Sequence, residues 1–245
     1  MYIVINGVIV VLITFKLKKL IAIVLILSAA IAITAVFASR DDVSLTSAEG
    51  AEFVLVIDPG HGGCDGGAIA ANGTKESDIN LEIALKTEAI ADFAGIKSVL
   101  TRSTDTDGAE NGNYSERQNL LNRVDVINNT PDAVLISVHQ NVYPSDKVRG
   151  AEVMYAATNG SEELATMLQS NLVSYLDTEN RRVARPAPEE LLVTSSIRCT
   201  GVLAECGFLS CPDEAQRLAS YDYQLKIAEI FIASFLQFTC GKTAY

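Results

Sequence analysis

The sequence predicts an α/β fold: a single layered domain with a central, mostly parallel or mixed twisted sheet flanked by helices, behind an N-terminal hydrophobic segment. Short apolar runs bounded by turn residues alternate with longer segments of helical periodicity, as in chains built from strand–helix units. Of the 245 residues, 49 % are hydrophobic, which is enough for one packed core. The length is too small for two large domains.

The N-terminal segment has the character of an export signal or a membrane anchor. Residues 20–38 carry no charge and come after three closely spaced lysines. A helix of this length spans roughly 28 Å, close to the hydrocarbon core of a bilayer, and lysines in front of it favour export of the C-terminal domain. The small residue Ala38 suits cleavage by a signal peptidase, whereas the length suits a retained anchor. We therefore expect residues 1–38 to be a signal peptide or an anchor.

A linker and the start of the folded domain come next. Residues 39–51 are small and polar, as linkers are, so the folded domain is expected at 52–242. The apolar run 53–57 predicts a buried strand, and 78–93 has apolar residues at helical spacing with a glycine after it as a stop. Residues 97–101 predict a second strand. Ser115, three residues before a glutamine, forms a capping box that opens a further helix.

The second half of the domain continues the alternation. Residues 133–138 form another apolar run and 151–156 alternate between apolar and polar, so both predict strands. Residues 161–176 predict an amphipathic helix, 202–204 a short strand and 222–238 a strongly apolar closing helix. Where such strands are parallel, functional sites gather at their carboxyl ends.

The charge of the domain is strongly negative. The chain has 19 Lys and Arg against 30 Asp and Glu, a formal charge of −11. Because residues 1–38 hold three lysines and no acid, the remainder has 16 basic and 30 acidic side chains, a net charge of −14. A nucleic-acid-binding role is excluded on this basis, since it requires a basic face. The aromatic content of 7 % also disfavours a surface that stacks bases.

The five cysteines do not form a disulfide framework. Their number is odd and no CxxC pair is present, although one disulfide remains open. Apolar neighbours indicate that Cys199, Cys206 and Cys211 are buried thiols. The spacings do not suit a cysteine-based zinc site.

The two histidines are the best candidate metal ligands. His61 stands in IDPGHGG directly after the first strand, and His139 stands in LISVHQN at the end of another apolar strand. Parallel pairing would bring these ends to one edge of the sheet. Two imidazoles and one carboxylate make a three-ligand zinc site with an open position. The alternatives are a turn histidine and a hydrogen-bonded core histidine.

Two glutamates complete the candidate set. Glu76 stands in the polar turn NGTKESD before the first helix and could supply the third ligand. Its alternative is an acid of the first helical turn, favoured by the helix dipole. Glu205 stands in VLAECGF, where a carboxylate beside an apolar strand is costly without a partner. It could act as a general base, or it could be a hydrogen-bonded structural acid.

These motifs together carry a family resemblance. The ordered segments IDPGHGG, Glu76, LTR, SVHQN and AECGFLS resemble those of the zinc-dependent N-acetylmuramoyl-L-alanine amidases of the Amidase_3 type. The resemblance covers residues 53–238. The short architecture behind a hydrophobic segment, with ECGFLS, is most similar to the spore-cortex members that act during endospore formation.

The resemblance implies a set of roles. It implies that His61, Glu76 and His139 bind Zn²⁺ and that Glu205 is the catalytic glutamate. It implies a peptidoglycan hydrolase that uses a zinc-activated water to cleave the amide between N-acetylmuramic acid and L-alanine of the stem peptide. The protein would be exported and either anchored in the membrane or secreted to the cell wall, including the forespore intermembrane space.

Three further residues match family positions, and three rival functions stay open. Arg102, Arg123 and Asn141 match the family but have ordinary structural roles available, so they are not counted as catalytic. The rivals are a zinc peptidase that cuts within the stem peptide, a non-catalytic wall-binding regulator, and an enzyme that needs an activating protein partner. The last is motivated by the acidic domain, which has no separate module to hold it on an anionic wall.

Overall fold

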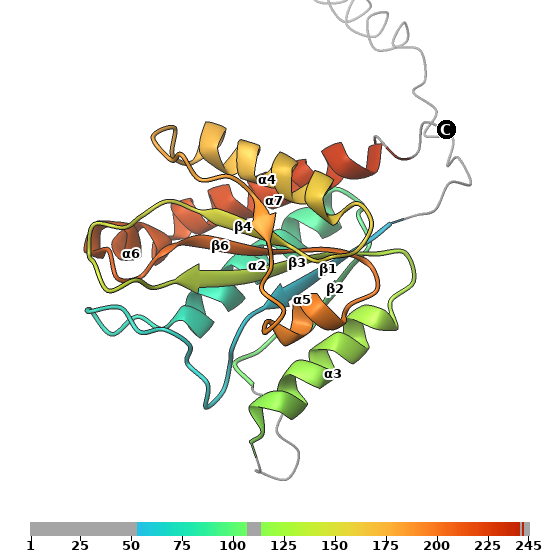
Figure 1. Cartoon of the computed structure of the whole chain (residues 1–245), viewed down its shortest axis with the longest axis horizontal. Helices are drawn as coiled ribbons and strands as arrows, with labels where there is room; N and C mark the ends of the chain where they lie inside the picture. Colours follow the sequence, from blue (N-terminus) through green and yellow to red (C-terminus); the bar gives the residue numbers. More distant parts are fainter. Residues whose placement is uncertain (1–52, 107–113, 241, 243–245) are drawn as a thin grey trace, which may run out of the picture. The chain divides into compact units, whose positions relative to one another are not determined.

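The computed structural model describes residues 53–106, 114–240 and 242 (Figure 1). The predicted signal peptide or anchor at 1–38 and the linker at 39–51 lie outside the described residues. Among the helices that are described, none is both long and apolar enough to cross a membrane.

A six-stranded sheet forms the centre of the domain, in the order β2-β1-β3-β6-β4-β5. Its strands are β1 (Val54–Pro59), β2 (Ser98–Leu100), β3 (Ala133–Asn141), β4 (Glu152–Tyr155), β5 (Arg185–Pro186) and β6 (Thr200–Phe208). β2, β1, β3 and β6 are parallel, whereas β4 runs antiparallel to β6 and β5 runs parallel to β4. The predicted α/β class with a mostly parallel or mixed sheet is therefore confirmed.

Helices cover both faces of this sheet. They are α2 (Glu76–Phe93), α3 (Glu116–Asn128), α4 (Ser161–Tyr175), α5 (Leu192–Ser196), α6 (Pro212–Leu218) and α7 (Tyr221–Cys240). α2, α4 and α7 pack together on one face, and α3 and α5 pack on the other (Figure 1). β1 and β3 are almost continuously buried, as expected for strands covered on both sides.

The elements begin close to where the sequence predicts them, with differences at their ends. The Ser115 side chain accepts the backbone N–H of Gln118 at 3.3 Å, which confirms it as the N-cap of α3. α2 begins two residues before the predicted start, so Glu76 belongs to its first turn rather than to the preceding loop. β6 extends well beyond 202–204, which places Glu205 inside the strand instead of at its end.

The cysteines agree in part with expectation. Cys206 and Cys211 are buried thiols, as predicted, and burial raises the pKa of Cys206 above its ordinary value. Cys199 is only partly buried.

Candidate active site

The loop after β1 carries His61 in an unusual backbone conformation. His61 has φ of 58°, in the left-handed region that non-glycine residues seldom occupy. The guanidinium of Arg123 donates to the carbonyl of His61 at 2.5 Å and to that of Pro59 at 2.6 Å. Arg102 donates to the carbonyls of Pro59 and Gly60, both at 2.9 Å. The two buried arginines thus hold the loop in the conformation that aims His61 into the site.

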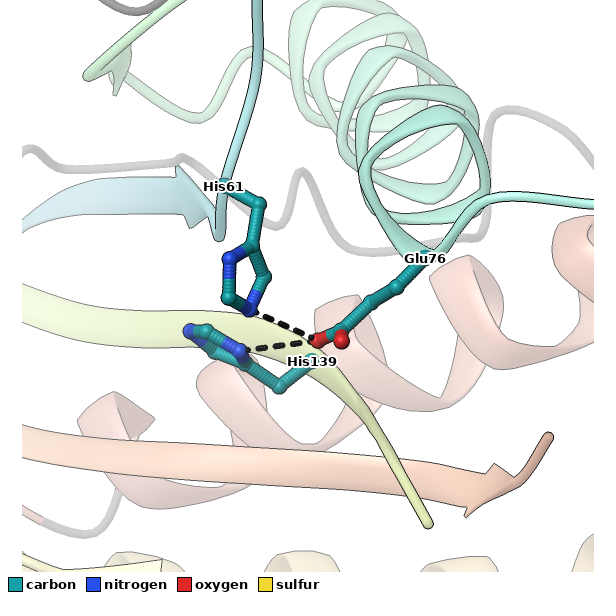
Figure 2. Close-up of side chains that lie close together, drawn as sticks. All are labelled: His61, Glu76 and His139. Carbon is teal, nitrogen blue, oxygen red and sulfur yellow. Dashed lines mark hydrogen bonds and ion pairs between the residues drawn. The ribbon is translucent and has the colours of Figure 1, made fainter. Parts of the chain in front are cut away.

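His139 and Glu76 reach the same point from other elements. His139 lies near the end of β3, and because β1 and β3 are parallel neighbours, the two histidines share one edge of the sheet. Glu76 is the first residue of α2 and is buried. Figure 2 shows both imidazole rings directed at its carboxylate.

The geometry of these three residues is compact. Oε1 of Glu76 lies 3.3 Å from Nε2 of His61 and 3.0 Å from Nδ1 of His139. The imidazole rings meet edge to face, with centroids 5.1 Å apart. One ligand atom from each residue lies within 4.8 Å of the others, which is the spacing of a site that can hold a metal ion.

The charges in the cluster favour an ionised carboxylate. Burial acts to raise the pKa of Glu76, but the two imidazoles outweigh it and lower that pKa well below the usual range. Burial acts to lower the pKa of His61, but Glu76 and Asp65 outweigh it and raise that pKa to about 9. The carboxylate of Glu76 is therefore ionised, and it is available as a ligand when a metal ion replaces the proton on His61.

Neighbouring groups fix the orientation of the candidate ligands. Nδ1 of His61 lies 2.8 Å from Oδ2 of Asp65, which leaves Nε2 directed at the cluster. Glu76 accepts the backbone N–H groups of Ala68 at 2.9 Å and Gln140 at 3.0 Å. Such outer contacts orient the ligands of metal sites in proteins.

Two glycines make the approach of these side chains sterically feasible. A Cβ on Gly60 would lie 2.2 Å from the His139 ring, and a Cβ on Gly67 would lie 2.7 Å from both His61 and Glu76. Gly67 also has φ of 63°. Any larger residue at either position would displace a candidate ligand.

Glu205 faces the cluster from the adjacent strand. It pairs with His139 in the β3–β6 register, and both line a cavity of about 380 Å³ together with His61 and Glu76. Burial raises the pKa of Glu205 to about 7. Its Oε2 atom is buried and has no hydrogen-bond partner among the described residues. An unpartnered buried carboxylate oxygen is costly, and it is placed to take a proton from a group bound in the cavity.

The structure also shows supporting contacts that the sequence patterns do not reveal. Asp58 is buried and lies 2.8 Å from Nη1 of Arg123, and it also accepts the hydroxyls of Thr101 and Ser137. In the sequence, Arg102 and Arg123 are only matches to a family. Their role as clamps on the His61 loop depends on contacts far apart in sequence, so no local pattern could reveal it. Asn141 ends β3 and lines the cavity.

Comparison with known proteins agrees with this arrangement. The family model described as N-acetylmuramoyl-L-alanine amidase matches residues 55–236. The germination-specific N-acetylmuramoyl-L-alanine amidase of Bacillus subtilis is 34 % identical over 194 residues, which are 77 % of this chain and 81 % of that protein.

Solved structures agree as well. The CwlD amidase from Clostridioides difficile, determined in complex with the GerS lipoprotein, is similar with a TM-score of 0.72 and 32 % identity, over 77 % of this chain and 99 % of that one. An N-acetylmuramoyl-L-alanine amidase from Clostridium difficile 630 has a TM-score of 0.69 and 32 % identity, over 79 % and 100 % of the two chains. The chain belongs to the N-acetylmuramoyl-L-alanine amidase family of peptidoglycan hydrolases.

Proposed function

We propose that this amidase uses Zn²⁺ held by His61, Glu76 and His139, with Glu205 as its proton-transfer residue. One observation carries the proposal: three ligand atoms within 4.8 Å of one another share a cavity with a buried carboxylate oxygen that has no partner among the described residues. The family activity is hydrolysis of the amide between N-acetylmuramic acid and L-alanine. The assignment of individual residues to that reaction is our proposal.

The donor set fits zinc. Two imidazole nitrogens and one carboxylate oxygen are a ligand combination found in catalytic zinc sites, where a fourth position stays open to water and substrate. Asp65 next to His61 supplies the carboxylate–histidine contact typical of such sites. All three residues line the cavity that Glu205 also lines, so water and substrate would reach a bound metal ion from that cavity.

The chemistry depends on these positions. Zinc, when bound, polarises the substrate carbonyl and acidifies the attacking water. Glu205 accepts the proton of that water as the C–O bond forms, and then delivers it to the alanine nitrogen as the C–N bond breaks. The products are the muramic acid carboxylate and a stem peptide with a free amino group. The pKa of Glu205, raised by burial to about 7, suits a group that must both accept and return a proton near neutral pH.

The setting of the reaction is proposed from the relatives. Cell-wall amidases act outside the cytoplasm, so the chain is an exported protein. Because one relative is germination-specific and another was solved with a lipoprotein, we place this chain in spore-cortex remodelling with an activating protein partner. The hydrophobic segment at 1–38 would hold it at the membrane or direct its secretion.

The test is digestion of purified peptidoglycan and defined muropeptides, with zinc and after chelation, followed by mass spectrometry of the products. We expect release of intact stem peptides beginning with L-alanine. Fragments cut inside the stem peptide would instead identify a peptidase.

Variants separate the two roles. His139→Ala is expected to lose both zinc and activity, whereas Glu205→Gln should lose activity about 10²–10⁴-fold and retain zinc. The matched control Glu189→Gln, an exposed glutamate, should behave as the unchanged protein. Full activity of Glu205→Gln would contradict the assignment.

A further inference from the structure

A pair of arginines lies beside the active site on the far side of β6. Glu152 is the first residue of β4 and forms ion pairs with both arginines. Its Oε2 lies 3.1 Å from Nη2 of Arg185, and its Oε1 lies 3.5 Å from Nη1 of Arg182. The Arg182 guanidinium also lies 4.8 Å from the ring of Phe208, and its Nε donates to the carbonyl of Arg149. Arg182 is therefore held by three contacts, and Arg185 by its ion pair with Glu152.

The strand register puts Glu152 and Arg185 on the same side of the sheet as Glu205, and Arg182 contacts the same Glu152 carboxylate. Glu152 pairs directly with Glu205 across the antiparallel β4–β6 ladder, and directly paired residues point to the same face. Arg185 is the register partner of Met154, which lies two residues after Glu152 on that face. The order across the sheet edge is thus His139, Glu205, Glu152 and the arginines.

The charge around the cavity is unequal. The cavity is lined on one side by two exposed glutamates, Glu116 of α3 and Glu190 from the segment before α5. Arg182, Arg185 and Glu152 do not line this cavity but lie next to it, because Glu152 is the register partner of the lining residue Glu205. These three side chains together carry one net positive charge. The exposed fraction of the side chain is 44 % for Arg185 and 29 % for Arg182, against 12 % for Glu152. In a domain with a large acid excess, this side is the favourable one for an anionic group.

We propose that Arg182 and Arg185 form a subsite for the carboxylates of the stem peptide. The proposal rests on the function proposed above and names the side of the site that takes the stem peptide. The peptide would extend from the metal cluster past Glu205 toward the arginines, away from Glu116 and Glu190. Glu152 is a positioning residue, because it orients both guanidinium groups.

The dimensions suit this path. Neighbouring strands lie about 4.8 Å apart, so the backbone of Glu152 is roughly 10 Å from that of His139. An extended peptide advances about 3.3 Å per residue. A carboxylate on the second or third residue of the stem therefore comes within reach of the arginines when the amide of the first residue is at the cluster.

The experiment compares two muropeptides that differ only in the second stem residue, D-glutamate with a free α-carboxyl group or its amidated form. For the double variant R182Q/R185Q we expect kcat/KM for the free acid to fall about 10–100-fold, mostly through KM, because the substrate carboxylate loses its hydrogen bonds to charged donors. The amidated substrate should change less than about 3-fold. Arg181→Gln, in the same loop and 74 % exposed, is the matched control and should leave both values unchanged.

A second measurement, of binding alone, tests the proposal without relying on catalytic turnover. The affinity of the released stem peptide, measured by calorimetry, should fall about 10-fold or more in R182Q/R185Q and be restored in part by R182K/R185K. Equal losses on both substrates, or an unchanged affinity, would show that the arginines only brace β5 against β4. If the unchanged protein cleaved neither muropeptide, the proposed function would fail, and the peptide affinity would still decide the role of the arginines.

Discussion

At the scale of single residues, the orientation of His61 depends on Asp65. The 2.8 Å contact to Nδ1 fixes which ring nitrogen faces the cluster. We predict that Asp65→Asn lowers zinc affinity about 10–100-fold, as loss of an outer-shell partner does at other metal sites. A competition titration against a chelator measures this affinity.

A matched substitution tests whether this effect is local. Asp146→Asn removes an exposed carboxylate elsewhere and should leave zinc affinity unchanged. An equal drop in both variants would mean that overall negative charge, rather than the contact to His61, attracts the metal.

Asp58 is a second residue on which the site depends. It neutralises Arg123, and Arg123 in turn holds the carbonyl of His61. Removing one partner of a buried ion pair leaves the other charge uncompensated, so we predict that Asp58→Asn lowers the free energy of unfolding by about 3–5 kcal/mol. Chemical denaturation measures the loss.

The same carboxylate gives a pH dependence of stability. Burial acts to raise the pKa of Asp58, but Arg123 and the hydroxyl donors outweigh it and hold that pKa below its ordinary value of 3.8. A carboxyl with a lowered folded-state pKa stabilises the protein above the unfolded-state pKa, and this contribution is lost as the pH falls through the folded-state value. Asp58→Asn should therefore reduce the steepness of acid unfolding below pH about 4. An unchanged acid transition would show that other carboxyl groups govern it.

At the scale of elements, α6 joins two parts of the sheet through one side chain. The buried carboxylate of Glu214 accepts the backbone N–H of Phe208 at 2.8 Å and that of Gly150 at 3.0 Å. Glu214→Ala would leave both donors without this acceptor. We predict a loss of about 2–4 kcal/mol in the free energy of unfolding, from thermal or urea denaturation.

Asp213, the residue before Glu214, provides the control. It also lies in the first turn of α6 but is exposed, so Asp213→Ala should lower the free energy of unfolding by only about 0.3–1 kcal/mol, through the helix dipole. Similar losses in the two variants would show that Glu214 acts only through the helix terminus.

The elements differ in how far the sequence can predict them. α4 and α7 are predictable from their apolar periodicity, because a face of that width must be buried. The short α5, α6 and β5 are not predicted, since their few residues carry too little pattern and depend on contacts with distant segments. The sequence predicts β6 too short because Glu205 and Gly207 interrupt its apolar run. The folded structure explains both residues: Glu205 lines the cavity, and a Cβ on Gly207 would clash with the side chain of Glu214.

At the scale of the whole molecule, the sheet topology assembles the site from distant positions. The parallel pairing of β1, β3 and β6 puts His61, His139 and Glu205 along one edge of the sheet. Glu76, the first residue of α2, contacts both histidines at that edge. The convergence of the histidines could be predicted, because carboxyl ends of parallel strands meet. The contacts of Asp65, Arg102 and Arg123 could not, because they depend on how separate loops fold against one another.

Zinc should therefore stabilise the whole domain as well as activate it. The proposed ligands come from the loop after β1, from β3 and from α2, so binding links three parts of the chain that unfolding separates. At a free zinc concentration of about 100 times the dissociation constant, the folded state gains about 2.7 kcal/mol. For a domain of this size that corresponds to a rise of roughly 5–10 °C in Tm. Differential scanning calorimetry with a zinc series and after chelation measures the shift. His139→Ala removes one proposed ligand and should abolish the concentration-dependent rise, whereas Asp146→Asn should retain it. A rise of the same size in His139→Ala would place the stabilising metal outside the His61, Glu76 and His139 cluster.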